Sequence, residues 1–227
     1  MQRQLHDIAA ARIGDRRVIL TNNNPEIDIL RYLDPIQPAW VQVVQQPRRR
    51  LSSFRFEIAR ESESPYIVSL DDDLFLGPEQ IEALGQTVVQ NPKAPHSVWG
   101  QNIVINENGS EDFEMVRHMN CQVDILNRAY ALTRMHVTRF FEILDVLGIP
   151  GVDELGPADD ILISHCGTER PWCHELGSFQ DCPTMDTPGI AAWKDDIFHP
   201  HRVSFLQQLQ RLGLRHQGSR SSPSMSI

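Results

Sequence analysis

The strongest chemical pattern in the sequence is a run of three aspartates, Asp71, Asp72 and Asp73, directly after the apolar residues 66–70. Adjacent carboxylates repel one another, and a divalent cation relieves that repulsion. Mg²⁺ and Mn²⁺ prefer oxygen ligands of this kind and are commonly shared with substrate phosphates. If the strand continues, Asp71 and Asp73 project to one side, which predicts a D-x-D metal site at the carboxyl end of a strand. The alternative is an acidic turn that caps a helix opened by Pro78, although capping needs only one carboxylate.

Two classes of enzyme use a D-x-D motif, and the flanking residues help to separate them. In nucleotide-sugar glycosyltransferases the motif holds a metal that bridges the diphosphate. In haloacid-dehalogenase-like phosphatases the first aspartate of D-x-D-x-Thr/Val is a nucleophile. Here the fifth position is Phe75, and the motif follows the third expected strand instead of the first, so both points favour the transferase. The phosphohydrolase stays open as an alternative, with Asp71 or Asp73 as nucleophile and Asp159 and Asp160 as metal ligands.

A second acidic pair, Asp159 and Asp160, precedes the apolar residues 161–163 at an expected helix start. Helix capping explains one of the two aspartates, and the other is available for catalysis or ligand binding. Residues 189–193, a run from glycine to tryptophan, are then expected to form a closing loop. Arg202 is expected to begin the last helix, where its planar guanidinium can meet a diphosphate through two hydrogen bonds. The alternative is that Arg202 is a surface residue and that His199 and His201 are solvated or packed.

Apolar periodicity and turn residues predict the elements that position these groups. Helices are expected over residues 2–13, 54–60, 79–89, 136–147, 158–165 and 203–212. Strands are expected over residues 17–21, 40–44, 66–70, 97–105 and 129–133, with a hairpin turn at 106–109. The first ninety residues alternate helix and strand, which is typical of a doubly wound α/β sheet. Residues 66–70 are almost wholly apolar and are therefore expected at the centre of a parallel sheet.

In chain order the sequence has an Asn-Asn pair after an early strand, Arg55-Phe56 on a helix, Ser-Leu-Asp-Asp-Asp at 69–73, Asp-Asp-Ile at 159–161, the run 189–193, and then His and Arg at 201–202. This ordered set resembles the exostosin family, the metal-dependent heparan sulfate N-acetylhexosaminyl- and glucuronyltransferase domains with a GT-A fold. The resemblance extends over residues 17–212 and is strongest at 66–75 and 158–163. It implies a UDP-sugar donor, a glycan acceptor, Mn²⁺ or Mg²⁺ as cofactor, and transfer with retention of configuration. The site residues that it implies are Asn23 and Arg55 at the nucleotide and diphosphate, Asp71 and Asp72 at the nucleotide-sugar, and Asp73 and Asp71 at the metal. The catalytic residues that it implies are Asp160 with its neighbour Asp159 at the reacting sugar, and Arg202, which steadies the leaving diphosphate.

Two departures from the family pattern stand out. Family members typically carry a disulfide whose two positions correspond here to Ala158 and Phe205, so apolar packing is expected in place of the bridge. The family's first strand, with its nucleotide-binding Thr-x-x-Arg-like motif, is expected before residue 1, and residues 2–13 would be the helix that follows it. The chain is therefore interpreted as truncated, and a catalytically inactive sugar- or partner-binding domain remains the non-enzymatic alternative.

Composition agrees with a globular chain and excludes several classes. The 227 residues include 21 Lys and Arg against 30 Asp and Glu, so the net charge of −9 argues against a nucleic-acid-binding protein. No apolar stretch approaches the length of a membrane span. A single domain is expected over residues 1–213, with a disordered Ser-rich tail over 214–227.

The four cysteines have spacings that match no common zinc finger, so free thiols or a local disulfide are expected. The cellular compartment stays open between the cytoplasm and, if an anchor precedes the chain, the Golgi lumen.

Overall fold

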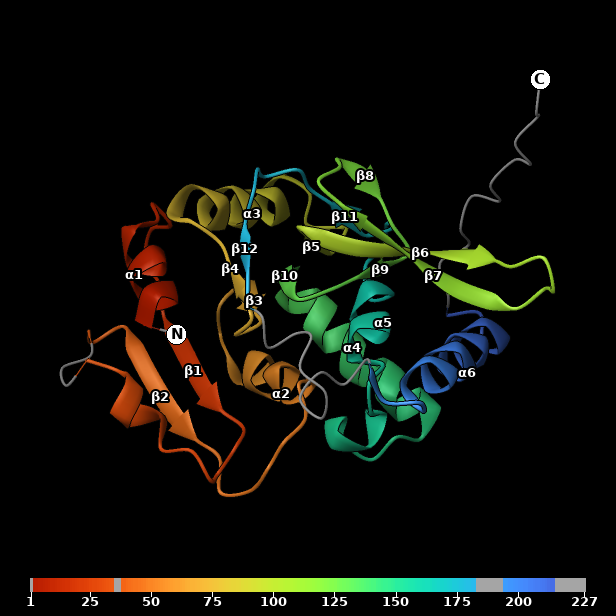
Figure 1. Cartoon of the computed structure of the whole chain (residues 1–227), viewed down its shortest axis with the longest axis horizontal. Coiled ribbons are helices and arrows are strands. Elements are labelled where there is room, and N and C mark those ends of the chain that lie inside the picture. Colours follow the sequence, from red (N-terminus) through yellow and green to blue (C-terminus); the bar gives the residue numbers. More distant parts are fainter. Residues whose placement is uncertain (1, 35–37, 183–193, 215–227) are drawn as a thin grey trace.

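The computed structural model describes residues 2–34, 38–182 and 194–214 of a mixed α/β protein (Figure 1). The helices are α1 Gln2–Ala10, α2 Phe54–Glu61, α3 Pro78–Gln90, α4 Arg134–Leu147, α5 Asp159–Ser164 and α6 Phe198–Arg211, with 3-10 turns η1 Ile29–Tyr32 and η2 Val152–Leu155. The strands are β1 Val18–Asn22, β2 Val41–Gln45, β3 Tyr66–Leu70, β4 Leu74–Phe75, β5 His96–Ser97, β6 Trp99–Ile105, β7 Glu111–Arg117, β8 Cys121–Gln122, β9 Ile125–Leu126, β10 Ala129–Thr133, β11 Trp172–Cys173 and β12 Gln180–Asp181. Among the described helices, none has the length and apolar character needed to cross a membrane.

The largest sheet is mixed and has the order β3-β10-β5-β11-β8. Strand β10 runs antiparallel to both β3 and β5, while β5 and β11 are parallel. Strands β1 and β2 are parallel but form a sheet of their own, and β6 pairs with β7 and β9 in a third sheet. The expected α/β class is confirmed at this level, as a mixed sheet flanked by helices.

The predicted position of residues 66–70 at the centre of a parallel sheet is wrong. They form β3, an edge strand of the five-stranded sheet, and the partner of β3 is the antiparallel strand β10. Tyr66 and Val68, on one face of the strand, are 41% and 39% exposed. Ile67, on the other face, packs against the main hydrophobic cluster. A short apolar run has the same composition whether it is buried on one face or on both, so the pattern did not distinguish these cases.

Most predicted elements are present, with shifted ends. The last helix, α6, begins at Phe198, five residues before its predicted start, and α1 ends at Ala10 instead of Ile13. The expected strand over residues 97–105 is divided at Val98 into β5 and β6, which belong to different sheets. The predicted hairpin turn at 106–109 connects β6 and β7. Leu214, predicted as the first residue of the tail, packs against the core, and residues 215–227 lie outside the described part of the chain.

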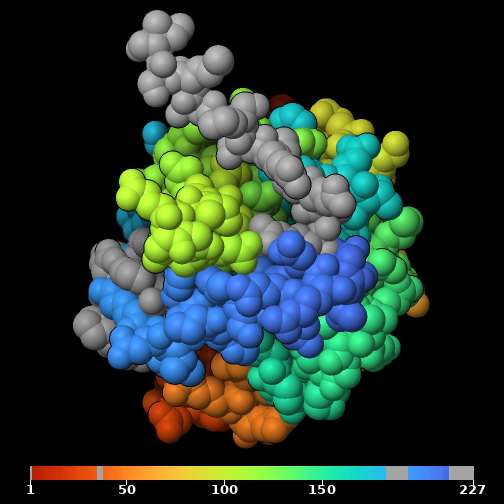
Figure 2. All heavy atoms as spheres, turned by 90° about the vertical axis from the view of Figure 1, so that its right-hand side faces the viewer, coloured from red at the N-terminus to blue at the C-terminus, as the bar shows by residue number. Residues whose placement is uncertain are grey.

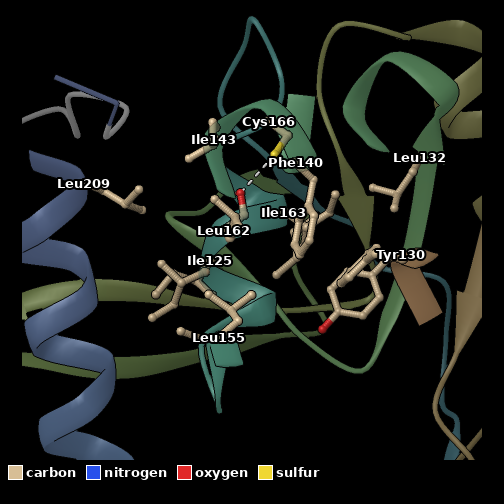
Figure 3. Close-up of a cluster of buried hydrophobic side chains, with 14 of the residues drawn as sticks. Ile125, Tyr130, Leu132, Phe140, Ile143, Leu155, Leu162, Ile163, Cys166 and Leu209 are labelled. Atoms are coloured by element: carbon tan, nitrogen blue, oxygen red, sulfur yellow. Dashed lines mark hydrogen bonds between the residues drawn. The ribbon is translucent and has the colours of Figure 1, made fainter. Parts of the chain in front are cut away.

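The main hydrophobic cluster holds α4, α5 and α6 against β9 and β10, and Figure 3 shows part of it. Ala158 and Phe205, the two positions expected to pack in place of a family disulfide, both belong to this cluster and are 0% and 5% exposed. Both side chains are therefore buried in apolar surroundings. Figure 2 shows α6 crossing one side of the molecule next to the β6–β7 hairpin. This packing brings the beginning of α6 to the beginning of α5, where the second acidic pair lies.

Candidate functional site

Five of the predicted site residues line one cavity of about 310 Å³. They are Arg55 from α2, Asp71 after β3, Asp159 and Asp160 from the first turn of α5, and Arg202 from α6. These residues are separated by up to about 150 positions in the sequence, and the cavity forms only because α2, α5 and α6 converge near the carboxyl end of β3. The other residues that line the cavity are Leu51, Ser52, Asn127, Tyr130, Gly156, Pro157, Asp195, Ile197 and Phe198.

The more deeply buried of the two ion pairs at the cavity is Arg202 with Asp160. Arg202 Nη1 lies 2.6 and 2.5 Å from the two carboxylate oxygens of Asp160, and Arg202 Nη2 donates to Gln101 Oε1 at 2.6 Å. Arg202 is only 2% exposed and Asp160 is 5% exposed. Arg202 lies in the second turn of α6 and does not begin the helix as predicted, since α6 starts at Phe198. The rings of Phe113 and Phe198 lie 4.9 and 5.1 Å from its guanidinium carbon, so the cation is held from several sides.

A second ion pair joins Arg55 on α2 to Asp71 at the end of β3. The Nε atom of Arg55 also lies 4.0 Å from Asp159 Oδ2, and Ser52 Oγ donates to the same oxygen at 3.3 Å. Arg55 therefore bridges the first acidic motif and the second. Burial alone would lower the pKa of Arg55, but Asp71, Tyr130 and Asp159 outweigh it, so the net pKa is raised and the guanidinium stays charged.

Burial and crowding shift the acidic groups of the cavity upward. Burial raises the pKa of Asp159 to about 6; Arg55 opposes the shift, while Asp160 and Asp71 add to it. Burial also raises the pKa of Asp71, against the pull of Arg55 and with a contribution from Asp73 and Asp72. The cavity thus concentrates negative charge that two arginines only partly compensate, and carboxyl groups with pKa values shifted in this way are common at functional sites.

Asp73 points to a different set of partners from Asp71. The chain turns after Leu70, with Leu74 N bonded to Asp71 O at 3.4 Å, so the strand does not continue through the aspartates as expected. Asp73 Oδ1 lies 3.0 Å from Arg128 Nη2, and Arg128 Nη1 donates to Asp181 Oδ1 at 2.5 Å. Of the three aspartates, only Asp71 lines the cavity, and Asp72 is exposed.

The remaining predicted residues are placed as follows. Asn23, just after β1, accepts a hydrogen bond from Thr21 Oγ1 at 3.1 Å and does not line the cavity. His199 and His201 lie within the first turns of α6, where His201 contacts Leu155 O at 3.0 Å and His199 contacts Asp112 at 3.1 Å. The loop over residues 189–193 lies outside the described residues.

Tyr130 is the main cavity residue that sequence reasoning missed. It is 3% exposed, its ring packs edge-on against Phe56 at 6.0 Å between centroids, and the guanidinium of Arg55 lies 5.5 Å from it. Burial raises its pKa well above the usual value, against Arg55 and with Asp159, Asp160 and Asp71 adding to the shift, so the hydroxyl keeps its proton. Figure 3 shows this hydroxyl at the edge of the hydrophobic cluster. The sequence offered no signal beyond a tyrosine in an expected strand.

Arg128 and Gln101 were missed as well. Arg128, before β10, has a positive φ of 64°, which few non-glycine residues adopt. Its carbonyl accepts from Asp71 N at 2.8 Å, so this one residue contacts the first acidic motif through both backbone and side chain. A register that pairs Ala129 with Leu70 places Arg128 opposite Asp71, but that antiparallel pairing was not predictable from local pattern.

The acidic motif predicts a cation site, which requires ligand groups close to one another. Within residues 2–34, 38–182 and 194–214, no group of three or more His, Cys, Asp or Glu side chains is arranged to hold a metal ion. The oxygen donors near the cavity are carboxylates, the ligand type that Mg²⁺ and Mn²⁺ take, and a cation shared with a diphosphate needs only one or two of them from the protein. The donor chemistry therefore fits, while a preformed all-protein site is not seen in these segments.

Comparison with known proteins adds no assignment. No protein-family model matches this chain, and no curated protein matches it significantly in sequence.

Proposed function

We propose that this chain is a metal-dependent GT-A-type glycosyltransferase, similar to the exostosin family, that transfers an N-acetylhexosamine or a uronic acid from a UDP-sugar to a glycan acceptor with retention. The observation that carries the proposal is the convergence of Arg55, Asp71, Asp160 and Arg202 on one cavity. Two arginines suit a diphosphate, and buried carboxylates suit the hydroxyls and the developing positive charge of a sugar. The mixed α/β architecture, with the cavity at the carboxyl end of β3, supports the same assignment.

The two arginines would bind and stabilise the leaving diphosphate. A guanidinium is always charged and presents its donors in one plane, which matches phosphate oxygens. Gln101 and Asp160 fix the plane of Arg202, and Asp71 fixes Arg55, so neither side chain has to be ordered when substrate binds. Negative charge that develops on the diphosphate during bond cleavage would thus meet donors that are already oriented.

The carboxylates would act on the sugar and the acceptor. In a retaining transfer the acceptor hydroxyl attacks from the side of the leaving group and gives its proton to the departing phosphate. Asp160 would stabilise an oxocarbenium-like sugar or orient the acceptor. Asp159, beside it, has a raised pKa of about 6, so it is mostly ionised at pH 7 and able to accept a hydrogen bond from the acceptor hydroxyl.

The cation would be held, together with the diphosphate, by Asp71, which lines the cavity, and by Asp73, which does not line it but is near enough to Asp71 to contribute to the shift of its pKa. When bound there, Mn²⁺ or Mg²⁺ supplies electrostatic neutralisation of the leaving group. Each of these carboxylates is also paired with an arginine, Asp71 with Arg55 and Asp73 with Arg128. The protein therefore holds both carboxylates in place by ion pairs.

The test is release of UDP from a panel of UDP-sugars by the purified chain with Mn²⁺, with calorimetric titration of UDP in the presence and absence of Mn²⁺. We expect hydrolysis or transfer with at least one donor and loss of turnover in Asp160→Asn and Asp73→Ala. Asp145→Asn, an exposed position on α4, is the matched control and should keep wild-type turnover.

Each alternative outcome has a defined reading. Wild-type turnover in Asp160→Asn and Asp73→Ala would disprove the proposed roles. UDP binding without UDP release from any donor would identify a binding domain instead of an enzyme. Trapping of the protein by beryllofluoride at Asp71 or Asp73 would identify a phosphohydrolase.

A further inference from the structure

Cys121 and Cys173 lie directly opposite each other in the antiparallel pair formed by β8 and β11. On the other side of β11, Trp172 N donates to Pro95 O, just before β5, at 3.0 Å, and His174 N donates to Ser97 O in β5 at 2.8 Å. Because successive N–H groups of a strand point to opposite sides, the N–H of Cys173 points toward β8.

The spacing of the backbone bonds defines the type of this pair. Val123 N donates to Pro171 O at 2.9 Å, and bonded pairs recur every two residues along an antiparallel ladder, so Cys121 and Cys173 form the next bonded pair. Such pairs have Cα atoms about 5.5 Å apart. Disulfides join Cα atoms that are roughly 4.4 to 6.8 Å apart. The backbone is therefore placed for a disulfide without a change of register.

The two side chains also leave the sheet on the same face, as directly opposed residues do. Cys173 is fully buried in the main hydrophobic cluster, and the half-buried Cys121 packs against that cluster. Burial raises the pKa of Cys173 to about 12, and the neighbouring thiol of Cys121 adds to the shift. All four cysteines lie in the described segments, and the structure holds all of them as thiols.

We propose that Cys121 and Cys173 are a redox-active pair that forms a reversible cross-strand disulfide on exposure to a disulfide oxidant such as oxidised glutathione. Cys121 is the more accessible thiol, so its thiolate attacks the oxidised glutathione first. The glutathione S–S bond breaks, one glutathione leaves and takes up a proton, and the other stays bonded to Cys121. Cys173 then gives its proton to solvent and attacks the Cys121 sulfur, which expels the second glutathione as a thiolate that is protonated in turn. Two thiols are oxidised and one glutathione disulfide is reduced to two thiols.

The bond would be easily reduced. The Cβ atoms of opposed strand residues are about 4.5 to 5.5 Å apart, whereas a relaxed disulfide brings them to about 3.8 Å. A bond made under that strain has a more oxidising potential than a structural disulfide, and it belongs to the labile, regulatory class.

Oxidation would also reach the neighbourhood of the acidic motif. The chain leaves β11 and continues to β12, where Asp181 binds Arg128, which in turn holds Asp73. A disulfide between β8 and β11 would join the start of the β11–β12 connection to the segment that follows β7. These two segments are already in contact, because Glu175 N donates to Asn120 Oδ1 at 3.0 Å. The redox state of the pair would therefore set how freely this segment moves relative to the rest of the sheet.

The experiment is disulfide mapping of the wild-type chain. The protein is incubated in buffers rich in oxidised or reduced glutathione, quenched with acid, alkylated with iodoacetamide, and digested with trypsin and the glutamate-specific protease Glu-C. Cleavage after Glu175 separates Cys173 from Cys182, so the linkage is read unambiguously by mass spectrometry. We expect a peptide that joins Cys121 to Cys173 in the oxidising buffer, with Cys166 and Cys182 alkylated, and recovery of both thiols in the reducing buffer.

Two cysteine-to-serine variants test which thiols form the disulfide. Cys121→Ser should abolish the linked peptide, while the matched Cys182→Ser should retain it. A glutathione adduct on Cys121 with no link to Cys173, or a link from Cys121 to Cys182, would overturn the proposal. Resistance of the bond to reduced glutathione would overturn its assignment as a reversible switch.

Discussion

Arg202 and Asp160, 42 residues apart in the sequence, form a buried ion pair in which one guanidinium nitrogen lies within 2.6 Å of both carboxylate oxygens. The side chains are 3% and 7% exposed, so water contributes little to their solvation. Asp160, predicted to act at the reacting sugar, and Arg202, predicted at the leaving diphosphate, thus also have a structural role, because they fix α6 to the start of α5. This double role decides how variants at either position must be interpreted.

A double-mutant cycle should show strong coupling between these two residues. Arg202→Met leaves a buried carboxylate without its partner, and we expect the free energy of unfolding to fall by about 3–5 kcal/mol. Replacing both residues, Arg202→Met with Asp160→Leu, should cost less than the sum of the single changes, since no buried charge remains uncompensated. Urea unfolding at pH 7 measures all three variants.

The matched control for this cycle is the exposed pair Arg139 and Glu142, one turn apart on α4 with 3.3 Å between the charged atoms. Its coupling energy, from the two alanine variants and the double variant, should be about 0.2–0.5 kcal/mol. A coupling for Arg202 and Asp160 that is no larger than that of the exposed pair would contradict the buried geometry.

Tyr130→Phe should separate the contribution of the hydroxyl to ligand binding and turnover from the contribution of the ring to packing. The ring remains in place against Phe56 and Arg55, so the free energy of unfolding should change by no more than about 1 kcal/mol. The hydroxyl, which lies among Asp71, Asp159 and Asp160, is lost, and UDP-sugar binding or turnover should fall by about tenfold or more. Calorimetry and UDP release provide the two readouts. An unchanged affinity together with unchanged turnover would remove Tyr130 from the site.

Local pattern predicted the helices, most strands and four of the residues that line the cavity, because apolar periodicity, turn residues and acidic motifs are all local signals. These four are Asp71, Asp159, Asp160 and Arg202, whereas Arg55 was implied only by the family resemblance. It did not predict which strands pair. The position of β3 at a sheet edge and the contact of Arg128 with Asp73 both follow from the antiparallel pairing of β3 with β10, two strands separated by more than fifty residues. That pairing depends on the energetics of the whole sheet and cannot be predicted from the composition of either strand alone.

The start of the last helix was misplaced for a different reason. Residues 199–201, His-Pro-His, look like a loop, because proline usually interrupts a helix. Here Pro200 is the third residue of α6, in the first turn, where the missing N–H has no helical partner to lose. The earlier start places Arg202 one turn inside the helix, and from there its side chain reaches Asp160.

Stability should fall on mild acidification because three histidines are held neutral. Burial lowers the pKa of His136 to about 4 and that of His174 to about 4, with His96 lowering both further, while backbone carbonyls of Lys93 and Pro92 oppose the shift at His136. Burial also lowers the pKa of His96, against its contact with Asn91 O and against Glu169. Between pH 6.5 and about 4 the unfolded chain binds protons that the folded chain does not. The stabilisation is therefore complete above pH 6.5 and is lost as the pH falls through this window.

Comparison of variants isolates this effect. Asp159 acts in the opposite sense, because its raised pKa means that the folded chain binds the extra proton between its ordinary value and about 6. We therefore expect the double variant His136→Gln with His174→Gln to have a smaller slope of unfolding free energy against pH. The slope should decrease by about 1.4 kcal/mol per pH unit for each proton that the unfolded chain no longer binds in excess of the folded chain. Urea unfolding at pH 7.5, 6 and 5 gives the slopes. Equal slopes in the variant and the wild type would contradict the assignment.

Two glycines provide a matched test of the packing that supports the site. Gly100 on β6 precedes Gln101, the partner of Arg202, and a Cβ there would lie 2.8 Å from Val123 Cγ2 and 2.9 Å from the backbone oxygen of Ile125. Gly85, on α3, has no atom within 4 Å of an added Cβ. Gly100→Ala should lower the free energy of unfolding by about 1–3 kcal/mol, since the backbone of β9 must move.

Gly85→Ala should instead raise the free energy of unfolding by about 0.5–1 kcal/mol, because alanine loses less backbone entropy in a helix. Because Gln101 orients Arg202, the displacement at β6 should also reduce UDP affinity in Gly100→Ala and leave it unchanged in Gly85→Ala. Thermal or urea unfolding and calorimetry measure both effects. Equal stability of the two variants would show that β9 moves easily to accommodate the added methyl group. In that case the close packing of β6 against β9 would not explain the position of Gln101.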